Sequence, residues 1–243
     1  MKSELPKVLH PVCGRPMLLH VLDAAGELDA PRVIVVLGYG HEQVAAYLPA
    51  ECLIALQEQQ LGTGHALLSA AELLPPGPAL VLPGDTPLVM GQTLLSLAVE
   101  HESSGAAATV LTTMLDDPSG YGRVLRAADG SVARIVEHRD ARTEELGVRE
   151  INSGMYVLPM PVTLQILEQA GSENDQGEIY LTDVVAGLRA RGQTVSASTV
   201  PDSSLVLGVN SQAELAQAEL IMSRRGAEVA PSVGHRQTRG PDQ

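Results

Sequence analysis

One segment of this 243-residue chain combines polar side chains with glycines that let a backbone approach a ligand closely. It reads Q-E-Q-Q-L-G-T-G-H-A at 57–66 and joins an expected strand to an expected helix. The free N–H groups at the start of such a helix point toward any ligand that lies there. A helix start that Thr63 simply caps would show the same residues, so both interpretations stay open at this point.

Two oxygen-bearing side chains are candidate ligands for Mg²⁺. Asp85, in V-L-P-G-D-T-P-L, ends an expected strand, and ligands of open α/β sheets bind beyond the carboxyl ends of strands. The alternative is that Asp85 only caps a turn before Pro87. Asn210, in L-G-V-N-S-Q-A-E-L, precedes a helix that Ser211 and Glu214 already supply with a capping box. Its amide oxygen is therefore a second candidate for the metal.

The second half of the chain offers hydrogen-bonding groups suited to a neutral sugar. They are the Y-G-R segment at 121–123, Glu137 in I-V-E-H, Asn152 in E-I-N-S-G and Thr182 in G-E-I-Y-L-T-D. Taken singly, each also fits a polar rim around a hairpin. Lys7, in an N-terminal loop, fits a solvated lysine equally well.

The elements that must position these residues alternate between strand and helix. Such alternation predicts an α/β fold with a doubly wound, mostly parallel sheet whose strands are buried on both faces. An alternating chain usually begins with a strand, whereas here a helix after Pro16 comes first, so the pattern predicts that a first strand is missing. The expected strands are 32–38, 52–57, 79–83 and 107–114, and the expected helices between them are 41–48, 63–74 and 91–102.

After Gly120 the pattern changes to a smaller lobe laid against the sheet. A hairpin turning at Asp129-Gly130 precedes the strand E-I-N-S-G-M-Y-V-L. We expect one domain over 1–225, with a nucleotide-binding half, 1–119, and a sugar-binding half, 120–225. Further helices are expected at 161–170, 179–191 and 212–224, and a disordered tail at 226–243.

Composition excludes several partners. The net charge is −13, with 16 basic and 29 acidic residues, which argues against nucleic acid and anionic membranes. The chain has no Trp, no Phe and five Tyr, so a nucleotide base would have to be recognised by hydrogen bonds. The two cysteines fit no disulfide scaffold or metal motif. No signal peptide or long apolar run occurs, and we expect a soluble, cytoplasmic protein.

Seven segments taken together resemble one family. The match covers about residues 1–225 and resembles the uridylyltransferase domain of bifunctional N-acetylglucosamine-1-phosphate uridylyltransferase/glucosamine-1-phosphate acetyltransferases. Other sugar nucleotidyltransferases share the fold and the strand-end Asp, but E-I-N-S-G with I-V-E-H indicates the N-acetylglucosamine member. In chain order the segments are L-P-K-V-L-H, L-G-T-G-H-A, G-D-T-P-L, D-D-P-S-G-Y-G-R, I-V-E-H-R-D-A, E-I-N-S-G and G-V-N.

The resemblance implies a role for each candidate residue. Gln57 would hydrogen-bond the uracil of UTP, and Gly62 and Thr63 would pack against the uridine. Asp85 and Asn210 would hold Mg²⁺. Lys7 would bind a phosphate, and Gly122, Glu137, Asn152 and Thr182 would bind the N-acetylglucosamine portion.

The implied reaction is in-line attack by a phosphate oxygen of N-acetylglucosamine 1-phosphate on the α-phosphorus of UTP. It releases pyrophosphate and forms UDP-N-acetylglucosamine, a precursor for peptidoglycan, cell-wall biogenesis and cell shape. Such a transfer depends on positioning and charge neutralisation more than on a general base. Lys7 and Asp85, with Mg²⁺, would be the catalytic groups.

Three departures from the family pattern affect these expectations. The pattern L-A-A-G-x-G-T-R-M, a phosphate-binding loop after the first strand, is represented only by Met1. Pro83 stands where family members carry a backbone N–H. The chain stops where the acetyltransferase domain would begin, so a monomer without the second activity is expected.

Three hypotheses follow from these departures. The chain is an enzyme whose start was placed too late, a non-catalytic remnant that binds sugar nucleotides, or a related enzyme with another base or sugar. Without a central first strand, we expect the 243-residue chain to fold poorly and to lack measurable activity.

Overall fold

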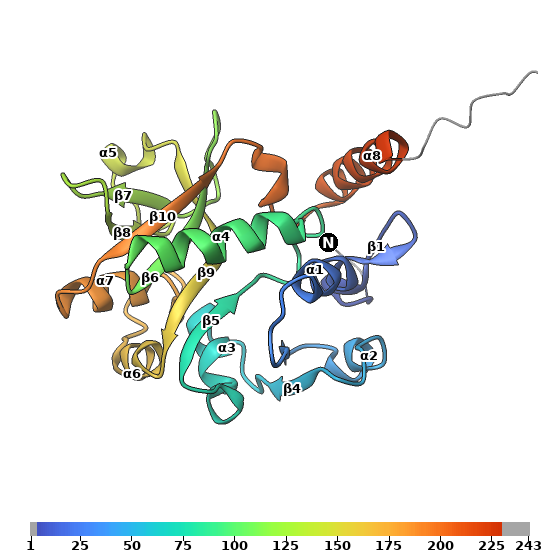
Figure 1. Cartoon of the computed structure of the whole chain (residues 1–243), viewed down its shortest axis with the longest axis horizontal. Coiled ribbons are helices and arrows are strands. Elements are labelled where there is room, and N and C mark those ends of the chain that lie inside the picture. The colour runs from blue at the N-terminus through green and yellow to red at the C-terminus, as the bar shows by residue number, and fades with distance from the viewer. Residues whose placement is uncertain (1–3, 230–243) are drawn as a thin grey trace, which may run out of the picture.

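The computed structural model describes residues 4–229 as an α/β arrangement with helices on both sides of the strands (Figure 1). The strands are β1 (Pro11–Val12), β2 (Arg15–Pro16), β3 (Ile34–Leu37), β4 (Leu53–Leu56), β5 (Gly77–Val81), β6 (Ala108–Met114), β7 (Arg123–Arg126), β8 (Val132–Val136), β9 (Glu150–Met160) and β10 (Val195–Val200). The helices are α1 (Met17–Gly26), α2 (His41–Ala45), α3 (Thr63–Ser69), α4 (Gly91–Ser104), α5 (Thr143–Leu146), α6 (Val162–Gln169), α7 (Asp183–Ala190) and α8 (Gln212–Val229), with 3₁₀ turns η1 (Lys7–Leu9), η2 (Ala71–Leu73) and η3 (Ser203–Leu205).

The long strand β9 organises the larger sheet. β6 pairs with one edge of β9, while β5 and β7 pair with different parts of its other edge, all antiparallel to it. β10 runs parallel to β6. β5, β6 and β10 therefore share one direction and β9 opposes them, which gives the mostly parallel sheet expected from the sequence. The β7–β8 hairpin extends this sheet, as the turn at Asp129-Gly130 predicts.

Four strands stand apart from this sheet, and β1 and β2 pair antiparallel as a small sheet of their own. β3 and β4 pair parallel to each other and form a separate two-stranded sheet. Within residues 4–229, no strand pairs with the second edge of β3 or of β5. The expectation that all four early strands are buried on both faces is wrong for β4, because Leu53, Ile54 and Leu56 are exposed at the outer edge.

Two apolar cores lie on opposite faces of the larger sheet. Val110 of β6 packs into the core formed with α6 and α7, and its neighbour Leu111 packs into the core formed with α1 and α4. Successive residues of a strand face opposite sides, so a strand buried on both sides must be apolar throughout. β6 is buried except for Met114 at its end, and it departs from this rule in three buried threonines, Thr109, Thr112 and Thr113, whose hydroxyls are all hydrogen-bonded.

Several element boundaries differ from the sequence-based expectation. α7 begins at Asp183 rather than 179, because residues 178–181 are bonded to the 61–64 loop. α8 continues to Val229, so the segment predicted to be disordered begins with a helical turn, and 230–243 lie outside the described residues. None of the helices in the described part of the chain is both long and apolar enough to cross a membrane.

Candidate active site

The side-chain ammonium of Lys7 lies between the two candidate metal ligands, Asp85 and Asn210. The Lys7 ammonium donates to Asp85 Oδ2 in a close ion pair and to Asn210 Oδ1 at 2.6 Å. These residues are 78 and 203 positions from Lys7 in the sequence. The structure thus brings together three residues that were selected separately from three different motifs.

Backbone contacts fix this arrangement. Asp85 lies in the loop that follows β5, and its carbonyl accepts a hydrogen bond from the Val209 N–H at 2.9 Å. A Cβ atom at Gly208 would lie 3.5 Å from both carboxylate oxygens of Asp85, so the two loops pass very close to each other. The start of α8 is therefore tied directly to the loop that carries Asp85.

Other side chains hold the turn after β5 and the start of α8. In the turn after β5, the Thr86 hydroxyl donates to the Pro83 carbonyl at 3.0 Å. At the start of α8, Glu214 accepts from the Asn210 and Ser211 N–H groups at 2.7 Å, and the Ser211 hydroxyl accepts from the Glu214 N–H. The capping box predicted for Ser211 and Glu214 is confirmed.

The donor set fits a divalent cation that also binds substrate. A carboxylate oxygen and an amide oxygen already converge on one positive charge, the Lys7 ammonium. The described residues contain no cluster of three or more His, Cys, Asp or Glu side chains that could hold a metal ion. Mg²⁺ commonly takes one or two protein ligands and completes its shell with phosphate oxygens and water. Asp85 and Asn210 are the residues that would hold it.

The 57–66 segment joins the two halves of the chain. A Cβ atom at Gly62 would lie 2.6 Å from the Ile179 carbonyl oxygen, and the Gly62 φ of +101° also favours glycine. The Thr63 hydroxyl does not cap α3, since it accepts from the Leu181 N–H at 3.1 Å. The close approach that these glycines permit is therefore to the 178–181 backbone.

Gln57 lies directly after β4, at the carboxyl end of a strand. Its side-chain NH₂ donates to the Gly62 carbonyl and contacts His65 Nδ1, both at 3.0 Å. These contacts hold the amide plane in place. The Gln57 carbonyl oxygen is then the atom suited to accept a hydrogen bond from a base.

Four residues predicted to bind a sugar form a second group. The Thr182 hydroxyl donates to Glu137 Oε1 at 3.2 Å, and the Asn152 N–H donates to the Gly122 carbonyl at 2.9 Å. A Cβ atom at Gly122 would lie 3.4 Å from Glu137 Oε2, so the two pairs are adjacent. Asn152 Oδ1 accepts from the Gly154 N–H at 3.0 Å, which fixes the amide.

The Glu137 carboxyl lies in an environment that favours its protonated form. Burial raises the pKa of Glu137 above its usual value, the Thr182 hydrogen bond opposes this shift, and the charges of Asp140, Asp183 and Glu178 add to it. A buried carboxyl next to a cavity is well placed to exchange hydrogen bonds with sugar hydroxyls.

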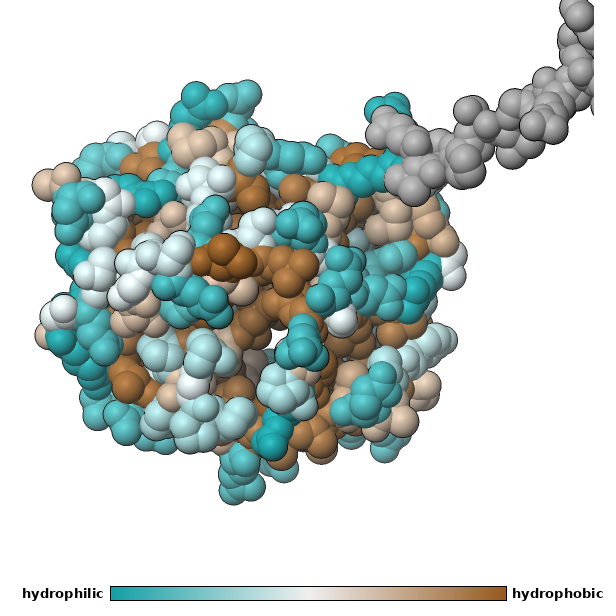
Figure 2. All heavy atoms as spheres, in the orientation of Figure 1, coloured by the Kyte–Doolittle hydropathy of each residue, from teal (hydrophilic) through white to brown (hydrophobic). Residues whose placement is uncertain are grey.

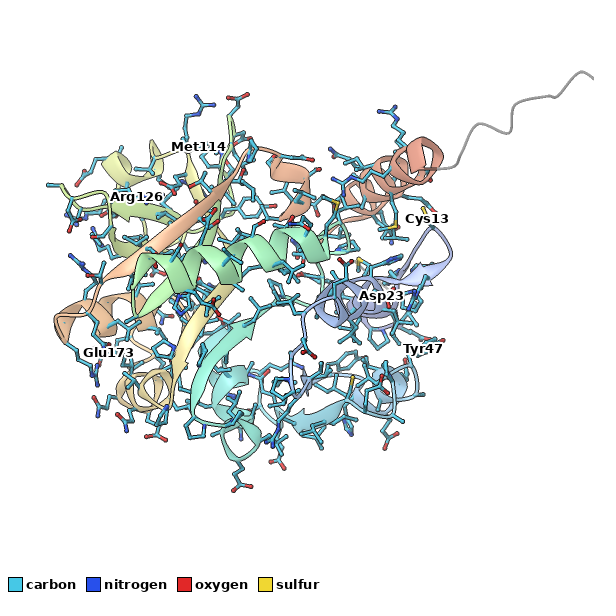
Figure 3. All side chains as sticks on the ribbon, in the orientation of Figure 1. Cys13, Asp23, Tyr47, Met114, Arg126 and Glu173 are labelled. Carbon is cyan, nitrogen blue, oxygen red and sulfur yellow. The ribbon has the colours of Figure 1, made fainter. Side chains whose placement is uncertain are left out.

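A cavity of about 590 Å³ opens beside this carboxyl. Glu137 and Thr182 line it, together with Tyr180 and Asp183, whereas Gly122 and Asn152 do not. Glu173, labelled in Figure 3, is another lining residue. The cavity gives a ligand access to one side of the Glu137–Thr182 pair.

Tyr121 connects the sugar-binding group to the cation site. Burial raises the pKa of the Tyr121 hydroxyl, and the nearby carboxylates of Glu214 and Asp85 raise it further. Since Tyr121 precedes Gly122, the two groups of polar residues are neighbours.

The burial of two residues at this site is not evident from the sequence. Arg123 is 1% exposed, and its guanidinium donates to the Tyr121 carbonyl. Arg123 Nη2 also lies 3.4 Å from His138 Nδ1, so this side chain contacts the segments on both sides of the β7–β8 hairpin. Tyr156 on β9 is also 1% exposed, and burial followed by the charge of Glu137 raises its pKa. The Y-G-R motif indicates Arg123, whereas Tyr156 lies among the apolar residues Met155, Val157 and Leu158 and belongs to no recognisable motif.

The fold and the site define the class of nucleotidyltransferases with an α/β sheet. A strand-end aspartate, an amide oxygen and a lysine converge at the carboxyl ends of strands, next to a sugar-type group of hydrogen-bonding residues. The chain belongs to the family of MobA-like NTP transferase domains, which matches residues 1–151.

The curated relatives are longer proteins. The chain is 48% identical over 227 residues to the bifunctional protein GlmU of Geobacillus thermodenitrificans (strain NG80-2), covering 93% of this chain and 50% of that protein. It is 46% identical over 230 residues to the bifunctional protein GlmU of Exiguobacterium sp. (strain ATCC BAA-1283 / AT1b), a match that covers 94% of this chain and 51% of that protein. The chain therefore spans about half the length of these relatives.

Solved structures share the fold. A UDP-glucose pyrophosphorylase in complex with UDP-glucose superposes with a TM-score of 0.69 at 18% identity, covering 91% of each chain. A UDP-glucose pyrophosphorylase from Acinetobacter baumanii superposes with a TM-score of 0.68 at 22% identity, covering 94% of this chain and 93% of that chain. At these identities the likeness establishes the fold alone.

Proposed function

We propose that this chain forms UDP-N-acetylglucosamine and pyrophosphate from UTP and N-acetylglucosamine 1-phosphate. The observation that carries the proposal is the convergence of Lys7, Asp85 and Asn210 next to the Glu137–Thr182 pair. The similarity to bifunctional GlmU proteins supports this choice of substrates. The product would feed cell-wall synthesis, and the chain would act as a cytoplasmic monomer.

Catalysis in this proposal rests on neutralising and aligning phosphates. Lys7 would move its ammonium from Asp85 to a phosphate oxygen, because a polyphosphate carries more negative charge than one carboxylate. Asp85 and Asn210 would hold Mg²⁺, which supplies charge neutralisation at the phosphates when bound. The attacking group is already an anionic phosphate oxygen, so the reaction needs no side chain to remove a proton.

Recognition of the two substrates would be divided between the two halves of the chain. The Gln57 carbonyl oxygen would accept from the uracil, with Gly62 and Thr63 beside the uridine. The sugar would lie against Gly122, Glu137, Asn152 and Thr182, whose groups match the hydroxyl and amide groups of N-acetylglucosamine.

Release of pyrophosphate tests the proposal directly. We expect Asp85→Ala to reduce release from UTP and N-acetylglucosamine 1-phosphate by about 10²-fold or more, because the charged ligand of the cation is removed. Asn210→Ala should reduce activity while leaving the melting temperature nearly unchanged, since Ser211 and Glu214 still cap α8. Glu144→Ala, at an exposed position, is the control and should have no effect.

A panel of other substrates tests the identity of the sugar and base. UDP-glucose pyrophosphorylases share the fold, so glucose 1-phosphate and dTTP are the sharpest competitors. Turnover with glucose 1-phosphate that equals turnover with N-acetylglucosamine 1-phosphate would contradict the proposed sugar. No pyrophosphate release with any pair would favour a non-catalytic role in binding sugar nucleotides.

A further inference from the structure

The strand β9 contains an irregularity next to the residues proposed to bind the sugar. Val110 of β6 lies opposite Tyr156, and Thr112 lies opposite Asn152. Two steps along β6 therefore match four steps along β9, so β9 bulges and holds two extra residues. Two steps of a strand span about 7 Å, about half of what four regular steps would span. The bulge thus brings Asn152 and Tyr156 closer together than a regular strand would, on one face of the sheet.

The residues of the bulge are suited to hold this shape. Gly154 has a φ of +79°, which favours glycine, and its N–H donates to Asn152 Oδ1 at 3.0 Å. The Ser153 hydroxyl donates to the Leu111 carbonyl at 2.6 Å and accepts from the Met155 N–H at 3.1 Å. It takes the place of backbone pairs that the bulge interrupts. The E-I-N-S-G segment therefore builds a fixed bulge, a device often found beside active sites.

The Tyr156 hydroxyl is a buried polar group that lies beside Glu137 and Asn152. Tyr156 is only 1% exposed. Burial and then the charge of Glu137 raise the pKa of this hydroxyl, and the Asn152 side chain lowers it, so both residues lie close to it. Even so, no atom of the described residues completes a hydrogen bond to the hydroxyl. Buried hydroxyls without a partner are uncommon and cost stability, so this one calls for a functional explanation.

The two neighbours of Tyr156 on the strand are ordinary core residues. Met155 and Val157 face the other side of β9 and belong to the core that includes Leu94 and Leu97 of α4. Figure 2 views the molecule from the side of α4, where hydrophobic side chains gather over and beside this helix. The unpartnered hydroxyl is therefore confined to the opposite face of β9, where the residues proposed to bind the sugar lie.

We propose that Tyr156 is a positioning residue for the sugar subsite, with its hydroxyl holding the Asn152 amide. This role rests on the proposed function, because it concerns the sugar of that reaction. Asn152 Oδ1 is already bonded to the Gly154 N–H, so the NH₂ group is the part from which the hydroxyl accepts a hydrogen bond. When the sugar is bound, the hydroxyl donates to Glu137, which orients it. The sugar does not touch this buried oxygen, and Tyr156 acts through Asn152.

Binding of two ligands to the full-length chain tests this role. UDP-N-acetylglucosamine carries the sugar and UDP lacks it, so the ratio of their dissociation constants reports on the sugar subsite without requiring turnover. We expect Tyr156→Phe to raise the dissociation constant for UDP-N-acetylglucosamine about tenfold in isothermal titration calorimetry and to leave that for UDP unchanged. The melting temperature should stay the same or rise, because the described residues form no hydrogen bond with the hydroxyl that is removed.

Two further variants serve as controls. Tyr47→Phe removes the hydroxyl of a tyrosine that is 52% exposed and is labelled in Figure 3, and it should leave both dissociation constants unchanged. In an Asn152→Ala background, Tyr156→Phe should change the dissociation constant for UDP-N-acetylglucosamine by about twofold or less, because the hydroxyl acts through the amide that is already absent.

Three results would overturn this role of Tyr156. If the unaltered chain binds neither ligand, the proposed function is wrong and the role falls with it. If the unaltered chain binds both ligands and Tyr156→Phe binds UDP-N-acetylglucosamine equally tightly, the role is wrong and the proposed function stands. Equal weakening for both ligands, together with a lower melting temperature, would mean that the hydroxyl only stabilises the fold.

Discussion

The strands β6 and β9 differ from β3 and β5 in what lies beside them. β6 has a paired strand on each edge and is buried along nearly its whole length, whereas β3 and β5 have one paired edge each and stay partly exposed. The buried strands are not the more apolar ones, since β6 contains three Thr and β9 contains Glu, Asn and Ser, whereas β3 is Ile-Val-Val-Leu and β5 is Gly-Pro-Ala-Leu-Val. Burial in this protein therefore depends on neighbouring strands more than on the hydrophobicity of the strand itself.

Hydrogen exchange measured residue by residue should show the largest difference between the two regions. We expect amides in β6 and β9 to exchange about 10³-fold more slowly than those in β3 and β4, a difference of about 4 kcal/mol in opening free energy. The reason is that β3 and β4 can open without disturbing the larger sheet. Equal protection in both regions, read by NMR or mass spectrometry, would mean that they unfold as one unit.

Truncating a leucine in each region sharpens the comparison. Leu111 in β6 is fully buried, so Leu111→Ala should lower the free energy of unfolding by about 3 kcal/mol through lost contacts and a cavity. Leu56 in β4 is 51% exposed, so Leu56→Ala should change it by about 0.5 kcal/mol or less. Urea denaturation of both variants measures the difference, and comparable losses would show that β4 is buried in solution.

Steady-state kinetics can test whether the two regions bind different substrates. We expect Asn152→Ala to raise the KM for N-acetylglucosamine 1-phosphate about tenfold with little change for UTP, because Asn152 belongs to the group around Glu137. Gln57→Ala is the reciprocal variant and should raise the KM for UTP by a similar factor. If each variant affected both substrates equally, neither residue would be assigned to one substrate.

The pH dependence of stability should show the smallest effect, and it should arise in the second half of the chain, around Glu137. Burial raises the pKa of Glu137, so the folded protein holds this proton more tightly than the unfolded chain does. The stabilisation is fully present below the ordinary pKa of Glu and is lost as pH rises through the raised value. Glu137→Gln should therefore reduce the loss of stability over that range, as measured by thermal melts at a series of pH values.

A matched variant keeps this result interpretable. Glu144→Gln changes an exposed carboxyl that is 74% accessible and should leave the pH profile unchanged. Burial, followed by the charge of Asp140, also raises the pKa of Asp183. Part of the pH dependence of stability should therefore remain in the Glu137 variant. A profile that Glu137→Gln does not alter would contradict a protonated Glu137 in the folded state.

Local patterns predicted most of the elements and the capping box, because periodicity and capping residues act over a few positions. β3, β4 and β6 lie within the expected ranges, and Ser211 and Glu214 cap α8 as their spacing indicates. The separation of β3 and β4 from the larger sheet could not be predicted from periodicity, since it depends on which strands meet. The same holds for the role of Thr63, whose partner lies 118 residues away.

The candidate site was predictable in its residue types and less so in its contacts. Asp85 and Asn210 were selected as oxygen ligands, but nothing in the sequence showed that Lys7 would stand between them. Arg123 belongs to the Y-G-R segment selected from the sequence, but its burial could not be predicted because a charged residue in a short strand normally faces solvent. Burial of a charge is a tertiary property, and only the folded chain displays it.

The ion pair between Lys7 and Asp85 neutralises the Asp85 carboxylate before a substrate arrives. A neutral site attracts free divalent cations less strongly than a bare carboxylate does, since the ammonium repels them. A polyphosphate that draws the lysine toward itself restores the negative charge of Asp85 at the moment of binding. In the proposed function, this resting ion pair would therefore favour cations that arrive together with a nucleotide over free ions in solution.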